Sequence, residues 1–129
     1  RKYLFELPDG QLIESVLIAF DDRDSLSACL SSQVGCAVGC TFCATGYLGF
    51  KRNLNHQEIV DQVMSIQRES GKRVANIVYM GQGEPLLNTD TVIESIKTLM
   101  NSVGIGARHI TVSTSGIVPG INQLAAANL

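Results

Sequence analysis

Residues Cys36–Cys43 read Cys-Ala-Val-Gly-Cys-Thr-Phe-Cys, so three of the four cysteines of the chain lie within eight residues. This C-x3-C-x2-C spacing places three thiols on one short loop, close enough to bind a single inorganic centre. A structural zinc site is normally closed by four ligands, whereas a catalytic site keeps one position open. An iron–sulfur cube held by three cysteines likewise leaves one iron free for a small molecule.

Two other interpretations of these cysteines remain open. A structural zinc site would need a fourth ligand, for which Cys29, His56 and His109 are available, although none lies at the paired spacing of a zinc ribbon. A disulfide is the weaker alternative, because three cysteines cannot all pair within the cluster and no secretory signal is visible. Clustered cysteines that bind a metal suit a reducing cytoplasm, which is the localisation that we expect.

The composition describes a globular chain. The 129 residues are enough for one domain with a modest core, and 45% of them are hydrophobic while 17% are charged. No apolar run reaches the ~18–20 residues that a membrane span needs. The net charge of −2 gives no overall electrostatic case for binding nucleic acid. Because the chain begins at Arg1 without a methionine and stops after an apolar helical pattern, we expect it to be part of a longer protein.

The first 24 residues are expected to form a β-hairpin and a connector, and residues 25–129 the domain that follows. Extended segments over residues 3–7 and 12–20 flank Pro8-Asp9-Gly10, which is a strong turn signal. The charged residues 21–24 indicate an exposed loop. Glu14 lies on the second arm of the hairpin, where its position alone indicates a solvated strand residue.

Three strand–helix units are expected after the connector. The predicted strands cover residues 26–31, 75–80 and 109–114, and the predicted helices cover 55–70, 91–100 and the residues from 119 onward. Such alternation implies parallel βαβ units with right-handed crossovers. Three units do not close a barrel, so the last strand is expected to have an unpaired edge.

Helix starts are predicted from capping boxes, in which a polar N-cap is followed three residues later by glutamate. Asn55 and Glu58 form one such pair, and Thr91 and Glu94 form another. Met64 widens the apolar face of the first of these helices, and we expect it in the core.

The segments that follow the three strands are the Cys36–Cys43 loop, the turn Gly81-Gln82-Gly83-Glu84-Pro85 and the turn Ser113-Thr114-Ser115-Gly116. In a parallel barrel, such segments all lie at the carboxyl-end face, where active sites form. The Gly-rich turn is not a nucleotide P-loop, because no Gly-Lys-Ser/Thr follows it. The sequence therefore predicts one site built from these three segments.

Five segments together resemble the RlmN/Cfr family of radical S-adenosylmethionine (SAM) RNA adenine methyltransferases. They are Cys29–Cys36, the cysteines at 40 and 43, Gly49–Leu54, Met80–Asn88 and Val112–Gly116. The resemblance runs from about Leu12 to the end of the chain. It implies an α/β fold, a partial radical SAM (β/α) barrel made of the first three βα units and preceded by a β-hairpin. Pro85 after Glu84 resembles the RlmN branch, since the Cfr branch tends to have alanine there.

The resemblance also implies the cofactors and their ligands. A [4Fe-4S] cluster would be held by Cys36, Cys40 and Cys43. The methionine part of SAM would chelate the open iron, and the residues in contact with SAM would be Gly83, Glu84 and Ser113.

The activity implied is methylation of an adenine in 23S ribosomal RNA, and in some members of a transfer RNA adenine, at C2 in the RlmN branch and at C8 in the Cfr branch. One SAM methylates a protein cysteine, and a second supplies a 5′-deoxyadenosyl radical that abstracts hydrogen from that methyl group. The resulting carbon radical adds to the adenine. Cys29 matches the second family cysteine, which assists release of the protein–RNA adduct. Glu14 matches the acidic proton acceptor, although its connector to Cys29 is slightly longer here.

The family implies an external electron donor such as flavodoxin, no membrane association and a monomeric full-length protein. The methyl-carrying cysteine of the family lies beyond this chain, so we expect the 129 residues alone not to turn over. Two alternatives are a radical SAM enzyme for a small molecule or peptide and a non-enzymatic zinc module. The basic pairs Lys51-Arg52 and Arg108-His109 are either phosphate contacts or ordinary surface charge.

Overall fold

The structure is a computed structural model that describes residues 1–19 and 26–129. The connector predicted at residues 21–24, Phe20 and the predicted domain boundary between residues 24 and 25 lie outside the described residues. None of the described helices combines the length and the apolar character needed to cross a membrane.

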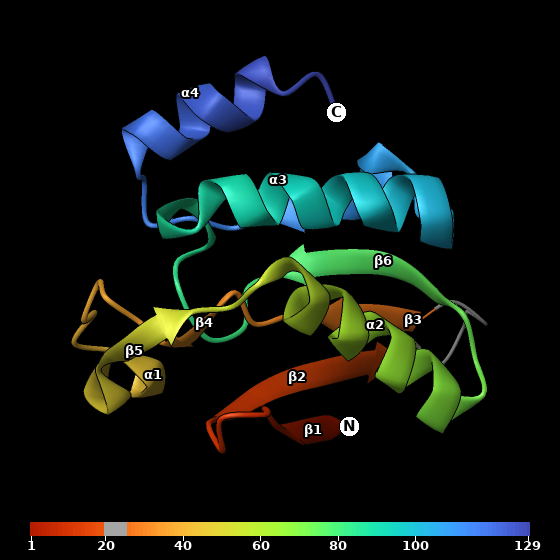
Figure 1. Cartoon of the computed structure of the whole chain (residues 1–129), viewed down its shortest axis with the longest axis horizontal. Coiled ribbons are helices and arrows are strands. Elements are labelled where there is room, and N and C mark those ends of the chain that lie inside the picture. Colours follow the sequence, from red (N-terminus) through yellow and green to blue (C-terminus); the bar gives the residue numbers. More distant parts are fainter. Residues whose placement is uncertain (20–25) are drawn as a thin grey trace.

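A five-stranded mixed sheet forms the centre of the molecule (Figure 1). Its strands are, in spatial order, β1 (Lys2–Glu6), β2 (Leu12–Ala19), β3 (Leu26–Cys29), β6 (Val74–Tyr79) and β7 (Ile110–Val112). The pairs β1–β2 and β2–β3 are antiparallel, whereas β3–β6 and β6–β7 are parallel. The hairpin and the three parallel strands that the sequence predicts are therefore present in one sheet, with β7 at its edge.

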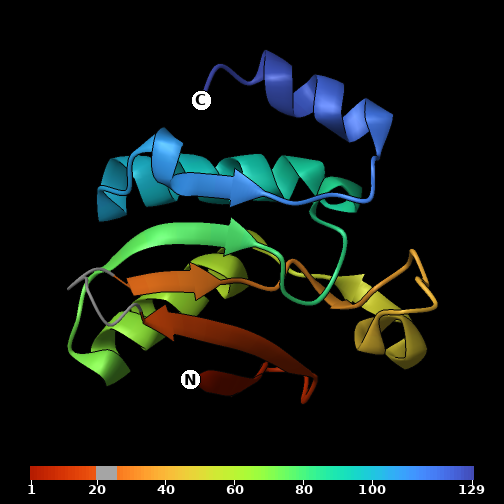
Figure 2. The ribbon, with the colours of Figure 1, turned by 180° about the vertical axis from the view of Figure 1, so that it is seen from behind.

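Helices cover one face of this sheet. They are α2 (His56–Ser70), α3 (Thr89–Thr98) with its π-helical extension η2 (Leu99–Val103), and at the β7 end α4 (Val118–Ala126); short 3-10 turns are η1 (Pro85–Leu87) and η3 (Ala107–His109). Figure 2 shows the opposite face with the five strands in front and no described helix over them. The sheet thus has a buried face and an open face, as half of a barrel would.

A second, two-stranded sheet lies beside the end of β3. It pairs β4 (Gln33–Gly35) with β5 (Phe50–Asn53) in antiparallel fashion, and the short helix α1 (Ala44–Leu48) lies between them in the chain. The Cys36–Cys43 loop leaves from β4, and β5 brings the chain back. These elements were not predicted, because strands of three and four residues carry too little periodicity to be recognised in a sequence.

The capping box at the start of α2 is present. The Asn55 side chain accepts a hydrogen bond from the Glu58 amide, and the Glu58 carboxylate accepts one from the Asn55 amide, each at 2.9 Å. The capping box predicted at Thr91 is wrong, since α3 already begins at Thr89. The turn before α3 forms η1, and the Asn88 side chain donates to backbone oxygens instead of capping the helix, so the chain enters α3 earlier.

The prediction that Met64 lies in the core is also wrong, because its side chain is 46% exposed. The buried stripe of α2 contains four apolar residues and the polar Gln62; the apolar ones are Ile59, Val60, Val63 and Ile66. Gln62 lies three residues after Ile59, on the same buried face of the helix, whereas Met64 lies outside that face.

Gln62 joins α2 to two strands through a saturated set of hydrogen bonds. Its Oε1 accepts from the Ser15 hydroxyl and from the Ser31 amide, at 2.5 and 2.9 Å. Its Nε2 donates to the Ser31 and Glu58 carbonyl oxygens at 3.0 and 3.1 Å. The Ser31 hydroxyl in turn donates to the Glu14 carbonyl. These bonds fix the segment that leads from β3 into the cysteine loop.

We expect Gln62→Leu to lower the free energy of unfolding by about 3 kcal/mol, because it leaves buried groups of Ser15 and Ser31 without partners. The matched control is Gln57→Leu on the exposed side of the same helix, which should change it by less than about 0.5 kcal/mol. Urea unfolding followed by far-UV circular dichroism measures both. Equal losses in the two variants would contradict the structural role of Gln62.

Candidate functional site

The segments that follow β3, β6 and β7 meet at one edge of the sheet. They line a common cavity of about 340 Å³. Its lining residues are Cys36, Val38, Cys40, Phe42 and Cys43 from the loop, Tyr79–Gly81, Gly83 and Glu84 from the β6 turn, and Ser113–Ser115 from the β7 turn. The cysteines and the residues predicted to contact SAM, which are Gly83, Glu84 and Ser113, are thus brought together.

Close backbone contact between two of these segments shapes the cavity. The Gly81 amide donates to the Leu30 carbonyl and the Ser32 amide donates to the Gln82 carbonyl, both at 2.9 Å. A Cβ atom at Gly81 would lie 2.6 Å from the Leu30 carbonyl oxygen. At Gly83, where φ is +99°, a Cβ atom would lie 2.5 Å from the Cβ of Gln33. Glycine is required at both positions, because the Leu30 backbone fills the space beside Gly81 and Gln33 fills the space beside Gly83.

The Glu84 carboxylate joins the β6 turn to the β7 turn. Its Oε1 accepts from the Leu86 amide at 2.9 Å and from the Thr114 hydroxyl at 2.7 Å, and its Oε2 accepts from the Ser115 amide at 2.7 Å. Burial by itself raises the pKa of Glu84, but the hydrogen bonds from Ser115, Leu86 and Thr114 outweigh it and hold the pKa below its usual value. The carboxylate is therefore ionised and already engaged by protein donors.

Gln33 also belongs to the site, although its sequence position did not predict this. Its side chain is buried, its Oε1 accepts from the Glu84 amide at 2.9 Å, and its Nε2 donates to Asn53 Oδ1 at 2.8 Å. Asn88 supports the same region by donating to the carbonyl oxygens of Ser32 and Leu54 at 3.0 and 2.9 Å. A polar residue three positions before the first loop cysteine was visible in the sequence, but its partners lie 20 and 51 residues away.

The cysteine loop is held by backbone hydrogen bonds. The Cys36 amide donates to the Gly49 carbonyl at 3.1 Å, and the Cys43 amide donates to the Cys40 carbonyl at 3.1 Å. Hydrogen bonds from the amides of Gly46 and Thr45 lower the pKa of the Cys43 thiol. This favours the thiolate, which is the form that binds metal.

All four cysteines are free thiols. Neither histidine lines the cysteine cavity. His56 Nε2 forms a hydrogen bond with the Thr98 hydroxyl, and His109 Nδ1 forms one with Asn76 Oδ1. Within residues 1–19 and 26–129, no three His, Cys, Asp or Glu side chains are arranged so that they could hold a metal ion. The loop offers three free thiols, those of Cys36, Cys40 and Cys43, to one cavity.

Cys29 and Glu14 are not among the residues that line the cysteine cavity. Cys29 lies directly opposite Val16 in the β2–β3 pair, and Glu14 lies two residues before Val16, so both side chains belong to the open face of the sheet. Burial raises the pKa of the Cys29 thiol, and a hydrogen bond with the Met80 backbone offsets this only in part. Glu14 accepts a hydrogen bond from the Lys2 amine at 2.9 Å.

The family model of the Radical SAM superfamily matches residues 30–128. The chain belongs to the radical SAM superfamily. A structure described as a radical SAM methyltransferase from Sphaerobacter thermophilus is similar to this chain with a TM-score of 0.88 and 48% identity, over 96% of this chain and 37% of that one. The predicted fold, part of a radical SAM barrel, is confirmed.

Relatives named probable dual-specificity RNA methyltransferase RlmN confirm the resemblance to the RlmN/Cfr family. The protein of Dictyoglomus thermophilum is 54% identical over 134 residues, which cover 100% of this chain and 38% of that protein. The protein of Thermotoga neapolitana is 55% identical over 126 residues, which cover 96% of this chain and 36% of that protein. The chain thus spans little more than a third of the length of these relatives.

We expect Glu84→Gln to lower the free energy of unfolding by about 2 kcal/mol at pH 7, because an amide nitrogen would face a backbone donor. The pKa of Glu84 is depressed from its ordinary value of 4.5, so the stabilisation is fully present above that value and is lost as pH falls through the lower native pKa. The difference between the wild type and the variant should therefore shrink below about pH 4.5.

Urea unfolding at several pH values measures this difference. The exposed Glu94→Gln on α3 is the control, and its effect should stay within about 0.5 kcal/mol. A difference for Glu84→Gln that does not vary with pH would show that the charge of Glu84 is not involved.

Proposed function

We propose that this chain is the cofactor-binding core of an RNA methyltransferase that modifies C2 of an adenine in 23S ribosomal RNA, with transfer RNA as a second substrate. The observation that supports the proposal is the common cavity in which the three loop cysteines face Gly83, Glu84 and Ser113. The relatives named RlmN support the choice of RNA as the substrate. We also propose a cytoplasmic location and an external electron donor such as flavodoxin.

The residues of the cavity fit a [4Fe-4S] cluster and SAM by their donor chemistry. When bound, these groups supply the radical chemistry that an unactivated aromatic carbon requires. Cys36, Cys40 and Cys43 would hold iron as thiolates. Gly83 lets the backbone of the β6 turn approach SAM, and Ser113 offers a hydroxyl from the β7 turn. We assign to the Glu84 carboxylate the task of holding these two turns together, in addition to the SAM contact expected from the family.

Cys29 and Glu14 are proposed to act on the open face of the sheet. The raised pKa favours the protonated thiol of Cys29, which suits a group that assists release of an adduct. Glu14 would accept a proton, and the Lys2 amine, which donates to its carboxylate at 2.9 Å, holds that side chain in place. Residues 1–24 would then contribute to the site of the domain formed by residues 25–129.

The cluster is tested with alanine variants of the cysteines in the longest polypeptide encoded by the gene that carries this chain. After anaerobic reconstitution, Cys36→Ala, Cys40→Ala and Cys43→Ala should each lose most of the bound iron and the broad visible absorption of an iron–sulfur centre. Cys29→Ala is the matched control and should retain both. Zinc without iron in the wild type would favour the structural metal module instead.

The reaction is tested by mass spectrometry of ribosomal and transfer RNA from cells with and without the gene. Digested nucleosides are compared with 2-methyladenosine and 8-methyladenosine standards, and the modified adenine is mapped to an RNA fragment. We expect 2-methyladenosine to disappear from 23S ribosomal RNA when the gene is deleted and to return with the wild-type gene but not with Cys29→Ala. Loss of 8-methyladenosine instead would assign the chain to the other branch of the family.

A further inference from the structure

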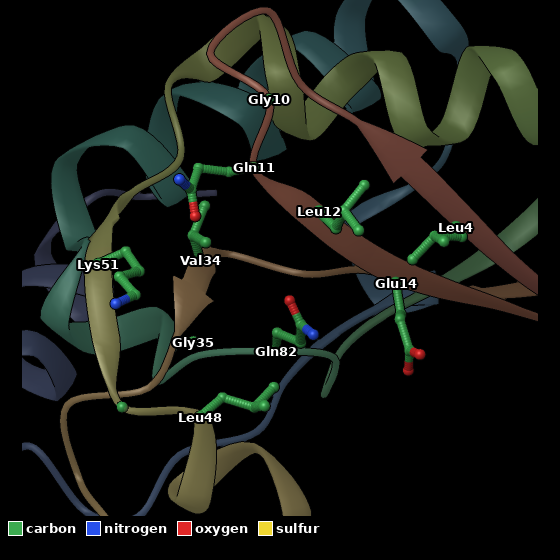
Figure 3. A pocket seen from close by; sticks show the side chains of 11 residues that line it. Leu4, Gly10, Gln11, Leu12, Glu14, Val34, Gly35, Leu48, Lys51 and Gln82 are labelled. Atoms are coloured by element: carbon green, nitrogen blue, oxygen red, sulfur yellow. The ribbon is translucent and has the colours of Figure 1, made fainter.

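A second cavity lies on the other side of the β6 turn. It has a volume of about 430 Å³, within the ~300–1,000 Å³ typical of ligand pockets. The β1–β2 hairpin, the β4–β5 sheet, Leu48 and the β6 turn contribute its walls (Figure 3). Gly81 and Gly83 line the cysteine cavity, whereas Gln82 between them lines this one. The two cavities are therefore neighbours that share a turn.

The walls of the second cavity expose apolar surface. Leu4, Leu12 and Leu48 line it and are 65%, 50% and 61% exposed, and the buried Val34 lines it as well. Large aliphatic side chains exposed around one hollow indicate a binding surface, since scattered exposed leucines would not face a common space. Apolar walls of this kind suit an occupant that presents an apolar surface, such as the face of a ring.

Three polar side chains in the same cavity have no partner among residues 1–19 and 26–129. Neither the Gln11 nor the Gln82 carboxamide makes a hydrogen bond there, and Lys51 makes no ion pair. The Gln82 oxygen is moreover buried. Figure 3 shows Gln82 and Lys51 lying on opposite sides of the hollow. An occupant that supplied a donor to Gln82 would remove the cost of that unpaired oxygen.

The charges at the cavity favour an anionic ligand. Glu14 is the only acidic residue among those lining it, and its charge is offset by Lys2 at 2.9 Å. The neighbouring Arg52 is neutralised by Asp9 and Glu58 at 2.7 and 2.8 Å. Among residues 1–19 and 26–129, Lys51 has no acidic partner. The occupant therefore combines a ring that carries hydrogen-bonding groups with a negative charge. A nucleotide has this combination, with its base between the leucines and a phosphate at Lys51.

We propose that this cavity binds one unstacked nucleotide of the RNA substrate, next in sequence to the adenine that is modified. The inference rests on the proposed function, because it takes RNA as the substrate. The adenine itself would lie where the cysteine cavity meets the open face that carries Cys29 and Glu14. Because Glu14 and the shared turn also line the second cavity, the next nucleotide would be within its reach. The Gln82 carboxamide would bond the edge of the base, as carboxamides do with adenine in other complexes.

The test measures RNA affinity by fluorescence anisotropy, without reductant, in the longest polypeptide that carries this chain. The probe is the RNA fragment in which the modified adenine has been mapped. It is used intact and with a single abasic site at the adenine, at its 5′ neighbour or at its 3′ neighbour. The variants are Gln82→Leu, which preserves the size of the side chain, and Lys51→Gln. The matched control is Lys97→Gln, an exposed cation on α3.

We expect Gln82→Leu to weaken binding of the intact RNA about tenfold. An abasic site at one neighbour should weaken wild-type binding to a similar extent but should not weaken Gln82→Leu further, because both changes remove the same interaction. Lys51→Gln should reduce the slope of log affinity against log salt by about 0.7, and Lys97→Gln should leave it unchanged.

The proposal would be overturned if the loss of affinity from Gln82→Leu added to the losses from abasic sites at the 5′ neighbour and at the 3′ neighbour alike. It would also be overturned if the Gln82→Leu loss failed to add to the loss from an abasic site at the modified adenine. If the wild type binds and modifies the RNA but both pocket variants behave like Lys97→Gln, the pocket proposal is wrong and the proposed function stands. If the wild type neither binds nor modifies RNA, the proposed function is wrong as well. Circular dichroism of Gln82→Leu checks its folding, and the salt dependence of Lys51→Gln decides independently if that variant fails to fold.

Discussion

The close backbone contact between the end of β3 and the Gly81–Gly83 turn is the constraint on which the site depends. The Gly81 amide reaches the Leu30 carbonyl at 2.9 Å, and no side chain other than hydrogen fits there. This contact brings the start of the cysteine loop against the turn after the neighbouring strand. It also divides the space around the turn, because Gly81 and Gly83 face one cavity and the Gln82 side chain faces the other.

The buried side chains of Gln33, Glu84 and Gln62 hold this arrangement in place through hydrogen bonds. Gln33 joins Glu84 to Asn53, Glu84 joins the β6 turn to the β7 turn, and Gln62 joins α2 to Ser31. A buried polar group is costly unless it is hydrogen-bonded, so such a network tolerates little displacement of its members. The result is a hydrogen-bonded frame beside the cysteine loop, which is itself held by backbone hydrogen bonds from the Cys36 and Cys43 amides.

The sequence predicted the parts of this structure that depend on local order. Alternating strands and helices implied parallel strands, and parallel strands implied that the three following segments meet at one edge, which the common cavity confirms. The Asn55 capping box was readable because both partners lie within one turn. The β4–β5 sheet, the role of Gln33 and the burial of Gln62 were not predictable, because their partners are distant in the chain. Met64 was misplaced for the same reason, since periodicity does not reveal that a glutamine replaces it in the buried stripe.

The adjacent basic residues Lys51 and Arg52 in β5 have different roles, which their shared positive charge does not reveal. Arg52 turns toward the protein, where Glu58 and then Asp9 raise its pKa and fix its side chain, and it also supports the capping box of α2 through Glu58. Lys51 points to the other face of the strand, as successive residues of a strand must, and lies against the second cavity. The pair therefore contains one structural cation and one that is available to a ligand. A net charge of −2 says nothing about this division, because a phosphate responds to the field at one cavity and not to the sum over the chain.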